Sequence, residues 1–246
     1  MTEIVTAGIL VIGDEILSGR TKDKNIGFIA EYLTNIGIDL KEVRVVADDE
    51  IAIIEALNEL RRRYTYVFTT GGIGPTHDDI TADSIAKAFG VGIGHHPDVV
   101  ARFRARFSDA ELNEARLRMA RIPDGAELIE SATILAPGFK IENVVVMAGV
   151  PSIMQAMMDI VSPRLKSGVR MLSESVKAQA REGDIGGPLR AIAETHPDTS
   201  IGSYPSLDEN GVPVTSIVVR SRDADRLRAA MTAVEAMLAD VKVAGR

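Results

Sequence analysis

The chain has 246 residues, 46% of them hydrophobic, which is enough to bury a full core. Its 28 Lys and Arg against 35 Asp and Glu give a formal net charge of −7, which disfavours DNA, RNA or another nucleic acid as a partner. The absence of cysteine excludes disulfide bonds, thiolate metal sites and a cysteine nucleophile. Apolar runs are broken well before bilayer-spanning length and the N-terminus lacks a signal-peptide pattern, so we expect no membrane span and a cytoplasmic protein.

Short β-rich runs alternate with longer helical patterns from residue 3 to about residue 165. Strands are predicted at Ile4–Ile12, Ile38–Val46, Tyr66–Thr70 and Val144–Met147. Helices are predicted at Asn25–Asn35, Ile51–Arg63 and Ile80–Phe89, with one or two more within His95–Ile122. This alternation is typical of an α/β domain with a mostly parallel sheet and helices on both faces.

The pattern changes after Leu165. A strand is predicted at Val169–Ala180 and a helix at Pro188–Thr195. Two further strands, at Ser200–Tyr204 and Pro213–Arg220, are followed by an amphipathic helix at Asp223–Val241. We therefore predict two domains, residues 1–166 and residues 167–246, the second a small α+β unit. The second unit carries almost no candidate chemistry, which favours a packing or interface role.

A glycine-rich segment, Thr69–Thr76, lies where a buried strand ends and the next helix begins. In open α/β sheets, ligands bind at the carboxyl ends of strands. Glycines let successive backbone N–H groups converge on an anion, so the sequence predicts a phosphate-binding turn made by Thr70, Gly71, Gly72, Gly74, Pro75 and Thr76. The alternative is a tight turn in which the glycines serve only geometry. A P-loop NTPase is excluded, because no Lys-Ser or Lys-Thr follows the glycines.

Two adjacent carboxylates, Asp78 and Asp79, follow this turn. Carboxylates and a neighbouring phosphate repel each other, and a divalent cation such as Mg²⁺ bound between them offsets this repulsion. We therefore predict a metal site that uses Asp79, Asp78 and Asp14. Parallel strands end at one edge of a sheet, so Asp14, Asp48 and Asp79 are expected to face a common crevice. The alternatives are that Asp78 or Asp79 caps the next helix, and that Asp48 or Asp49 caps Ile51–Arg63.

Other features favour structural roles. The glycine string Gly90–Gly94 is typical of a helix C-cap and turn, and His95 and His96 have no partner at metal-ligand spacing. The arginines between residues 102 and 121 fit a solvated helix face, and methionines 147, 154, 157 and 158 fit a flexible core.

Four segments together resemble the molybdopterin-binding family. They are Gly13–Gly19, the pair Asp23 and Asn25, Thr70–Thr81, and Gly149–Pro151. The chain is most similar to the N-terminal module of competence/damage-inducible protein A and to the related domain of FAD synthases. The resemblance implies a three-layer α/β fold, self-association into a homodimer or homotrimer, and a ligand cleft around the glycine loop. It also implies a nucleotide or pterin phosphate such as molybdopterin as the ligand.

Similar proteins either adenylylate molybdopterin or act as metal-dependent pyrophosphatases on ADP-ribose or FAD. By this resemblance Gly71, Gly72 and Gly74 hold phosphate or pterin, and Asp48 and Asp79, the candidate catalytic residues, match the acidic positions of the adenylyltransferases. Asp14 and Asn25 lie in motifs shared with the pyrophosphatases.

The chain departs from the usual family pattern at Ser131–Phe139 and Met147–Met154, where polar contacts and a glutamate are missing. Three hypotheses follow. The protein is a metal-dependent hydrolase of a nucleotide diphosphate linkage, or it binds or adenylylates molybdopterin, or it is a non-catalytic ligand-binding scaffold.

Overall fold

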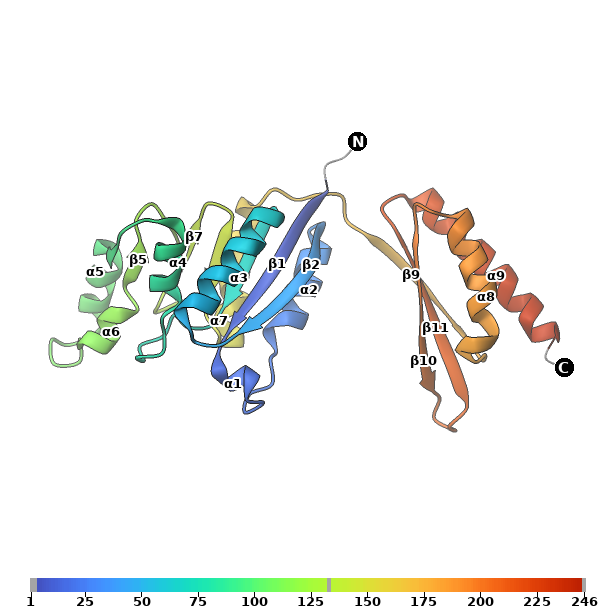
Figure 1. The fold of residues 1–246 in the computed structure, drawn as a ribbon, viewed down its shortest axis with the longest axis horizontal. Helices are drawn as coiled ribbons and strands as arrows, with labels where there is room; N and C mark the ends of the chain where they lie inside the picture. Colours follow the sequence, from blue (N-terminus) through green and yellow to red (C-terminus); the bar gives the residue numbers. More distant parts are fainter. Residues whose placement is uncertain (1–3, 132–133, 245–246) are drawn as a thin grey trace. The chain divides into compact units, whose positions relative to one another are not determined.

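The structure is a computed structural model that describes residues 4–131 and 134–244, without the side chains of residues 241–244. The chain divides after Gly168 into two compact units (Figure 1). The boundary predicted from sequence, after residue 166, lies close to this division. Each unit is described separately.

In the described part of the first unit, six strands form one sheet in the order β2-β1-β3-β8-β7-β6. Their bounds are Ile38–Val46 for β2, Val5–Ile12 for β1, Tyr66–Thr70 for β3, Val144–Met147 for β8, Gly138–Ile141 for β7 and Glu127–Ile129 for β6. The first four strands are mutually parallel, whereas β7 and β6 are added antiparallel at one edge. The predicted mostly parallel α/β fold is therefore confirmed.

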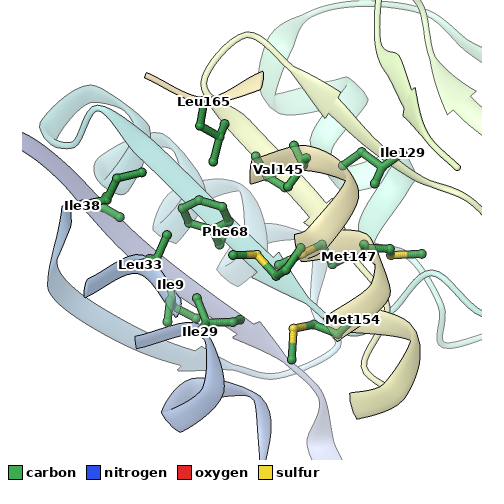
Figure 2. Close-up of a cluster of buried hydrophobic side chains, with 14 of the residues drawn as sticks. Ile9, Ile29, Leu33, Ile38, Phe68, Ile129, Val145, Met147, Met154 and Leu165 are labelled. Atoms are coloured by element: carbon green, nitrogen blue, oxygen red, sulfur yellow. The ribbon is translucent and has the colours of Figure 1, made fainter. Parts of the chain in front are cut away.

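Helices cover both faces of this sheet (Figure 1), which makes three layers. One face packs against α2 (Asn25–Asn35) and α7 (Pro151–Val161), and the other against α3 (Glu50–Arg63) and α4 (Thr81–Phe89). Figure 2 shows the first of these cores, where Phe68 of β3 packs among Leu33 of α2 and Met147 of β8. The central strands are mostly apolar because both of their faces are buried, although β3 ends in two buried threonines, Thr69 and Thr70.

Smaller elements complete the first unit. They are α1 (Asp14–Leu17), α5 (Pro97–Arg106), α6 (Glu114–Arg118), the 3₁₀ helix Ser162–Arg164, and the antiparallel pair β4 (Ile93–His95) and β5 (Arg121–Pro123). Gly90 caps the C-terminus of α4 with φ of 68°, as the sequence predicts. Met154, Met157 and Met158 of α7 are fully buried, which confirms the core role predicted for the methionines.

In the described residues of the second unit, an antiparallel sheet has the order β10-β11-β9 and is covered by two helices. The bounds are Leu172–Ala178 for β9, Glu182–Thr195 for α8, Ser200–Leu207 for β10, Pro213–Ser221 for β11 and Ala224–Ala244 for α9. Helix α8 begins six residues before the predicted start at Pro188. Ile185 and Leu189, one helical turn apart, are both buried in the core, and this burial extends the helix through Pro188.

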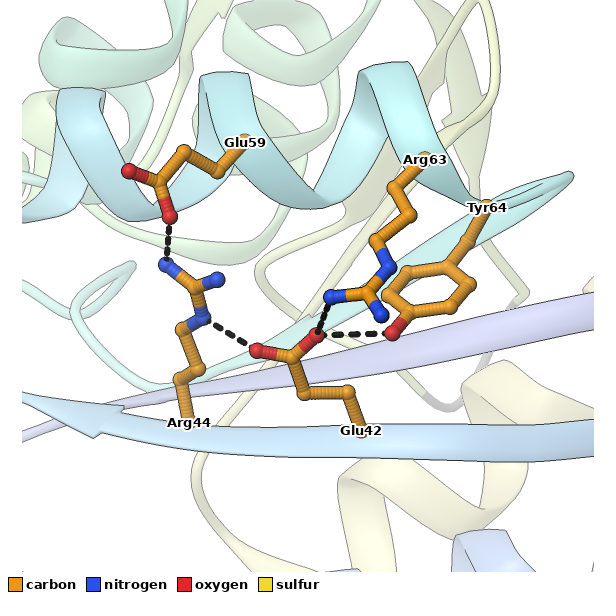
Figure 3. A network of polar contacts seen from close by, with 5 residues as sticks. All are labelled: Glu42, Arg44, Glu59, Arg63 and Tyr64. Atoms are coloured by element: carbon orange, nitrogen blue, oxygen red, sulfur yellow. Dashed lines mark hydrogen bonds and ion pairs between the residues drawn. The ribbon is translucent and has the colours of Figure 1, made fainter.

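A polar network joins β2 to α3 on the surface of the first unit (Figure 3). The Glu42 carboxylate accepts a hydrogen bond from the Tyr64 hydroxyl at 2.7 Å and pairs with Arg44 at 2.6 Å and Arg63 at 3.3 Å. Arg44 also pairs with Glu59. The Tyr64 hydroxyl and the Arg44 guanidinium hold the pKa of Glu42 below its ordinary value.

This network makes the free energy of unfolding depend on pH. A carboxyl whose pKa is lowered in the folded state stabilises the fold above its unfolded pKa, roughly 4.3, and the contribution is lost as the pH falls through the folded pKa. We expect Glu42→Gln to lose about 1 kcal/mol at pH 7 and to flatten the loss of stability below pH of about 4.3. Urea denaturation across this pH range measures both effects. The control is Glu59→Gln in the same network, whose side chain is 63% exposed and whose change should be smaller. Equal losses for the two variants would contradict the prediction.

Candidate functional site

The parallel strands place their carboxyl ends at one edge of the sheet, and the loops that follow them carry the predicted site residues. Gly13 follows β1, Asp48 follows β2, the segment Gly71–Ile80 follows β3 and Gly149 follows β8. Ligands bind at this edge in open α/β folds.

Gly71 and Gly72 have left-handed backbone conformations, with φ of 99° and 66°. A Cβ on Gly71 would lie 2.1 Å from the Ile12 carbonyl oxygen, and a Cβ on Gly72 would lie 2.1 Å from the Thr81 Oγ1. The Gly71 N–H donates to the Met147 carbonyl at 3.2 Å, and the Thr81 hydroxyl donates to the Gly71 carbonyl at 3.0 Å. Both glycines are therefore required by the packing of this turn. Phosphate binding by the turn stays a prediction, and the Gly71 N–H is already paired with the Met147 carbonyl.

The Asp79 carboxylate is used within the loop that carries it. Its carboxylate accepts hydrogen bonds from the Thr76 backbone N–H at 2.8 Å and from the Thr76 hydroxyl. The N-cap position of α4 is Ile80, and no side chain in the described structure caps this helix. The alternative that Asp78 or Asp79 caps α4 is therefore wrong, because the loop uses the Asp79 carboxylate internally.

Asp48 and Asp49 have different roles. The Asp49 side chain caps α3 by accepting from the Ala52 N–H at 2.9 Å. The Asp48 carboxylate instead accepts from the Asp14 N–H at 2.9 Å, which joins the loops after β1 and β2. Burial raises the pKa of Asp48, and the negative charges of Asp14, Glu15 and Asp78 raise it further. The hydrogen bond from the Asp14 N–H lowers this pKa, but by less than the other causes raise it. Four acidic side chains thus influence one another at this edge.

These acids do not form a preformed metal site. Among the residues that the structure describes, no three His, Asp or Glu side chains are grouped so that they could hold a metal ion. Asp14 and Asp78 act on Asp48 electrostatically, while Asp79 bonds to Thr76. The described donor set does not fit a resident cation.

A cavity of about 230 Å³ lies between the ends of β1 and β3 and the starts of α2 and α7. We call it the Asn25 cavity. Three predicted ligand residues, Asn25, Thr70 and Gly71, line it. Its other lining residues are Val11, Ile12, Glu15, Ile16, Thr21, Lys22, Asp23, Lys24, Gly149 and Pro151. Lys22 and Lys24 were not predicted from sequence, because exposed lysines in a loop carry no distinguishing pattern.

Two side chains of the Asn25 cavity have buried polar atoms without a partner. Asn25 is 5% exposed and Thr70 is 1% exposed. The Asn25 amide Nδ2 donates to the Gly149 carbonyl at 2.8 Å, but its Oδ1 has no hydrogen-bond partner within the described residues, and neither has the Thr70 Oγ1. Buried polar atoms in proteins are nearly always paired, so these two atoms indicate a ligand or ordered water.

Most of the remaining predicted residues line two other hollows, whereas Asp14, Asp48 and Asp78 line neither these nor the Asn25 cavity. Pro75 and Thr76 line a larger cavity of about 780 Å³ together with Lys87, Arg118 and Arg121. Two cations of this cavity already have partners: Lys87 pairs with Glu50, and Arg121 pairs with Asp83. Gly72, Gly74 and Asp79 line a void of about 10 Å³, too small for a ligand. The structure thus divides the predicted loop between two cavities and one small void.

The two segments that depart from the family pattern lie near this edge. Residues 132 and 133 are outside the described residues, so the first departure is described only in part. In the second, Ile153 occupies the position of the missing glutamate and is 36% exposed in the first turn of α7. Among the described residues we find no helix that combines the length and apolar composition needed to cross a bilayer.

Comparison with known proteins agrees with the fold and the motifs. The chain is 32% identical over 232 residues to a protein of Archaeoglobus fulgidus, covering 94% of this chain and 97% of that protein. It is 30% identical over 265 residues to a probable FAD synthase of Caenorhabditis elegans, covering 97% of this chain and 51% of the relative. The crystal structure of the protein CinA from Thermoplasma acidophilum, described as of unknown function, superposes with a TM-score of 0.62 at 32% identity, over 65% of this chain and 98% of that one.

Family matches follow the division into two units. Residues 170–245 match the middle domain of FAD synthase, which is the small sheet-and-helix unit. Residues 8–167 match the family described as a probable molybdopterin binding domain. This second match covers the parallel sheet, the glycine turn and the Asn25 cavity, and it confirms the resemblance found from the motifs. The chain therefore belongs to the molybdopterin-binding domain family.

Proposed function

We propose that the Asn25 cavity binds the ring system of a phosphate-bearing nucleotide or pterin. The observation that carries this proposal is the pair of buried, unpaired polar atoms, Asn25 Oδ1 and Thr70 Oγ1. Leaving a buried polar atom unpaired costs about 1–3 kcal/mol, and a ligand that pairs with both atoms removes this cost. The apolar walls from Val11, Ile12 and Pro151 suit a flat ring.

The size of the cavity supports a ring rather than a whole dinucleotide. Its volume of about 230 Å³ is below the roughly 300–1,000 Å³ of pockets that enclose a complete drug-sized ligand. The remainder of a nucleotide therefore extends outward. Lys22 and Lys24 line the cavity and are exposed, so their ammonium groups are available to phosphates there.

We further propose hydrolysis of the diphosphate linkage of an ADP-ribose-like or FAD-like dinucleotide. It is supported by the acidic group around Asp48, whose raised pKa suits a general base. Asp48 would take a proton from water as the water oxygen bonds to the adenylyl phosphorus, and the bond from that phosphorus to the bridging oxygen would break. The products are AMP and the other phosphate monoester, which leaves with the bridging oxygen and takes up the proton. The described residues do not fit a resident metal, so we assign no step to one; a cation enters only as the counter-ion of the substrate phosphates.

The second candidate is molybdopterin binding or adenylylation, favoured by the family match over residues 8–167. Here a pterin phosphate replaces water as the attacking group. The proposed cytoplasmic location and self-association into a dimer or trimer are compatible with both candidates.

Incubation of the whole chain with ADP-ribose, FAD, NAD or ATP, each with and without Mg²⁺, Mn²⁺ or Co²⁺, tests the proposals. AMP release is followed by chromatography, and binding by calorimetry. We expect AMP from ADP-ribose or FAD. Binding without cleavage under any condition would refute hydrolysis and leave the scaffold hypothesis, whereas pterin-dependent consumption of ATP would support the second candidate. Absence of binding by every nucleotide and by pterin would refute the proposed function.

A further inference from the structure

The loop that carries Asp78 and Asp79 has a shape of its own. The Thr76 N–H donates to the Asp79 carboxylate at 2.8 Å, and the Asp79 N–H donates back to the Thr76 carbonyl at 3.2 Å. The Thr81 N–H donates to the Gly72 carbonyl at 3.0 Å, which joins the loop to the start of α4. These bonds lie within the loop and its helix. The place of the two carboxylates relative to the rest of the unit therefore depends on other contacts.

Residues 93–123, which contain β4, α5, α6 and β5, form a cap beside α4 (Figure 1). The cap has a small hydrophobic core, in which Val99 and Phe103 are fully buried. Leu112 and Met119 lie just before and just after α6, and both pack against this core. The position of α6 is therefore set by packing inside the cap.

Arg118 is the last residue of α6, and its side chain joins the cap to the loop. The Arg118 Nε donates to the Asp79 carbonyl oxygen at 3.1 Å. The guanidinium also acts on the neighbouring carboxylate, since the Thr76 hydroxyl lowers the pKa of Asp78 most and the charge of Arg118 adds a smaller lowering. One half-buried cation thus holds the backbone of Asp79 and attracts the side chain of Asp78.

Two other arginines of the cap pair with different parts of the first unit. Arg121 pairs with Asp83 of α4, and Arg102 pairs with Glu130, which follows β6. In the part of the chain that the structure describes, neither of these side chains hydrogen-bonds to the loop. They attach the cap to the unit, so Arg118 contacts the loop from an anchored support.

We propose that Arg118 is a positioning residue, which fixes the loop that carries Asp78 and Asp79 in its place beside Asp48. The inference rests on the proposed function, in which Asp48 is the general base. Arg118 does not line the Asn25 cavity, so its contribution is to the geometry of the reaction and not to the binding of the ring. A displacement of about 1 Å at a reacting group can cost about 10²-fold in rate.

The test compares two substitutions of Arg118. Arg118→Met keeps the length of the side chain and removes its donors, whereas Arg118→Lys keeps a charged donor. For AMP release from ADP-ribose, we expect kcat of Arg118→Met to fall about 10- to 100-fold with KM unchanged. The lysine variant should recover most of this loss. Amide hydrogen exchange, followed by mass spectrometry, should be about 10-fold faster at residues 76–80 in Arg118→Met, because the loop has lost its external contact.

Arg102→Met is the matched control. It removes an ion pair from the same cap, and Arg102 lines none of the three cavities found in the described residues. Its kcat and its loop exchange should equal those of the wild type, even where the urea midpoint falls. Circular dichroism checks the fold of each variant. Arg118→Gln provides the same comparison if Arg118→Met does not fold.

The outcomes separate this inference from the proposed function. Loop exchange at the wild-type rate in Arg118→Met overturns the inference, whether or not AMP is released. A wild-type kcat in that variant, or an equal fall of kcat in Arg102→Met, also overturns it, and so does a rise in KM with kcat unchanged. If the wild type releases no AMP, the proposed hydrolysis fails, and the exchange rates alone decide whether Arg118 holds the loop.

Discussion

Replacing Gly71 with alanine is expected to reduce the free energy of unfolding by about 2–5 kcal/mol. The left-handed conformation, φ of 99°, costs an alanine about 1–2 kcal/mol. The new methyl group would lie 2.1 Å from the Ile12 carbonyl oxygen, and relieving such a clash in a packed region costs about 1–3 kcal/mol more. Urea denaturation measures the change. Because Gly71 and Ile12 both line the Asn25 cavity, AMP binding should weaken too.

Gly19 provides a matched control for this prediction. It also has a left-handed conformation, with φ of 72°, but a Cβ on it would have no heavy atom within 4 Å. Gly19→Ala therefore measures the conformational cost alone, about 1–2 kcal/mol. The difference between the two variants is the cost of the contact with Ile12. If Gly71→Ala lost no more stability than Gly19→Ala, the close packing of the turn against β1 would be contradicted.

Replacing Asp48 with asparagine is expected to reduce AMP release by about 10²- to 10⁴-fold, the usual contribution of a general base. Asparagine keeps an oxygen that can accept the Asp14 N–H bond, so the loops after β1 and β2 should stay joined. The substitution also removes one charge from a group of mutually repelling acids, so the free energy of unfolding should not fall. Turnover and urea denaturation of the same sample measure the two effects.

The neighbouring residue is the control for this experiment. Asp49 caps α3, and asparagine caps a helix as well as aspartate, so Asp49→Asn should change neither turnover nor stability appreciably. The raised pKa of Asp48 adds a pH test. Wild-type activity should fall as the pH is lowered through this raised pKa, because the protonated carboxyl cannot accept a proton. If the Asp48→Asn variant released AMP as fast as the wild type, the role of Asp48 as general base would be refuted. The proposed ligand binding would not be affected by that result.

Much of the fold could be predicted because its central elements have strong local patterns. The strand Tyr66–Thr70 and the helix Asn25–Asn35 have the bounds expected from apolar runs and helical spacing. The short strands β4 to β7 were not predicted, because three or four residues carry too little periodicity unless they form a continuous apolar run as in β8 (Val144–Met147). The start of α8 was wrong because a glycine-rich segment with Pro188 favours a loop locally, whereas burial of Ile185 is decided by the tertiary structure.

Residues of the candidate site could be named from the sequence, but their arrangement could not be predicted. Sequence motifs identified Asn25 and Thr70, and the position of the glycine turn followed from the end of β3. The unpaired Oδ1 of Asn25 depends on its bond to Gly149, which is 124 residues away along the chain. Likewise, Asp48 and Asp49 are equivalent helix caps by sequence, and only the approach of Asp14 gives them different partners. Local patterns cannot specify such contacts.

The clusters of buried hydrophobic side chains found among the described residues each lie wholly on one side of Gly168. An insertion or gene fusion at this joint would therefore separate no two residues of the same core. The C. elegans relative, of which this chain covers 51%, carries both units within a longer polypeptide. A joint that leaves each core intact allows the units to be gained, lost or recombined in evolution as independent modules.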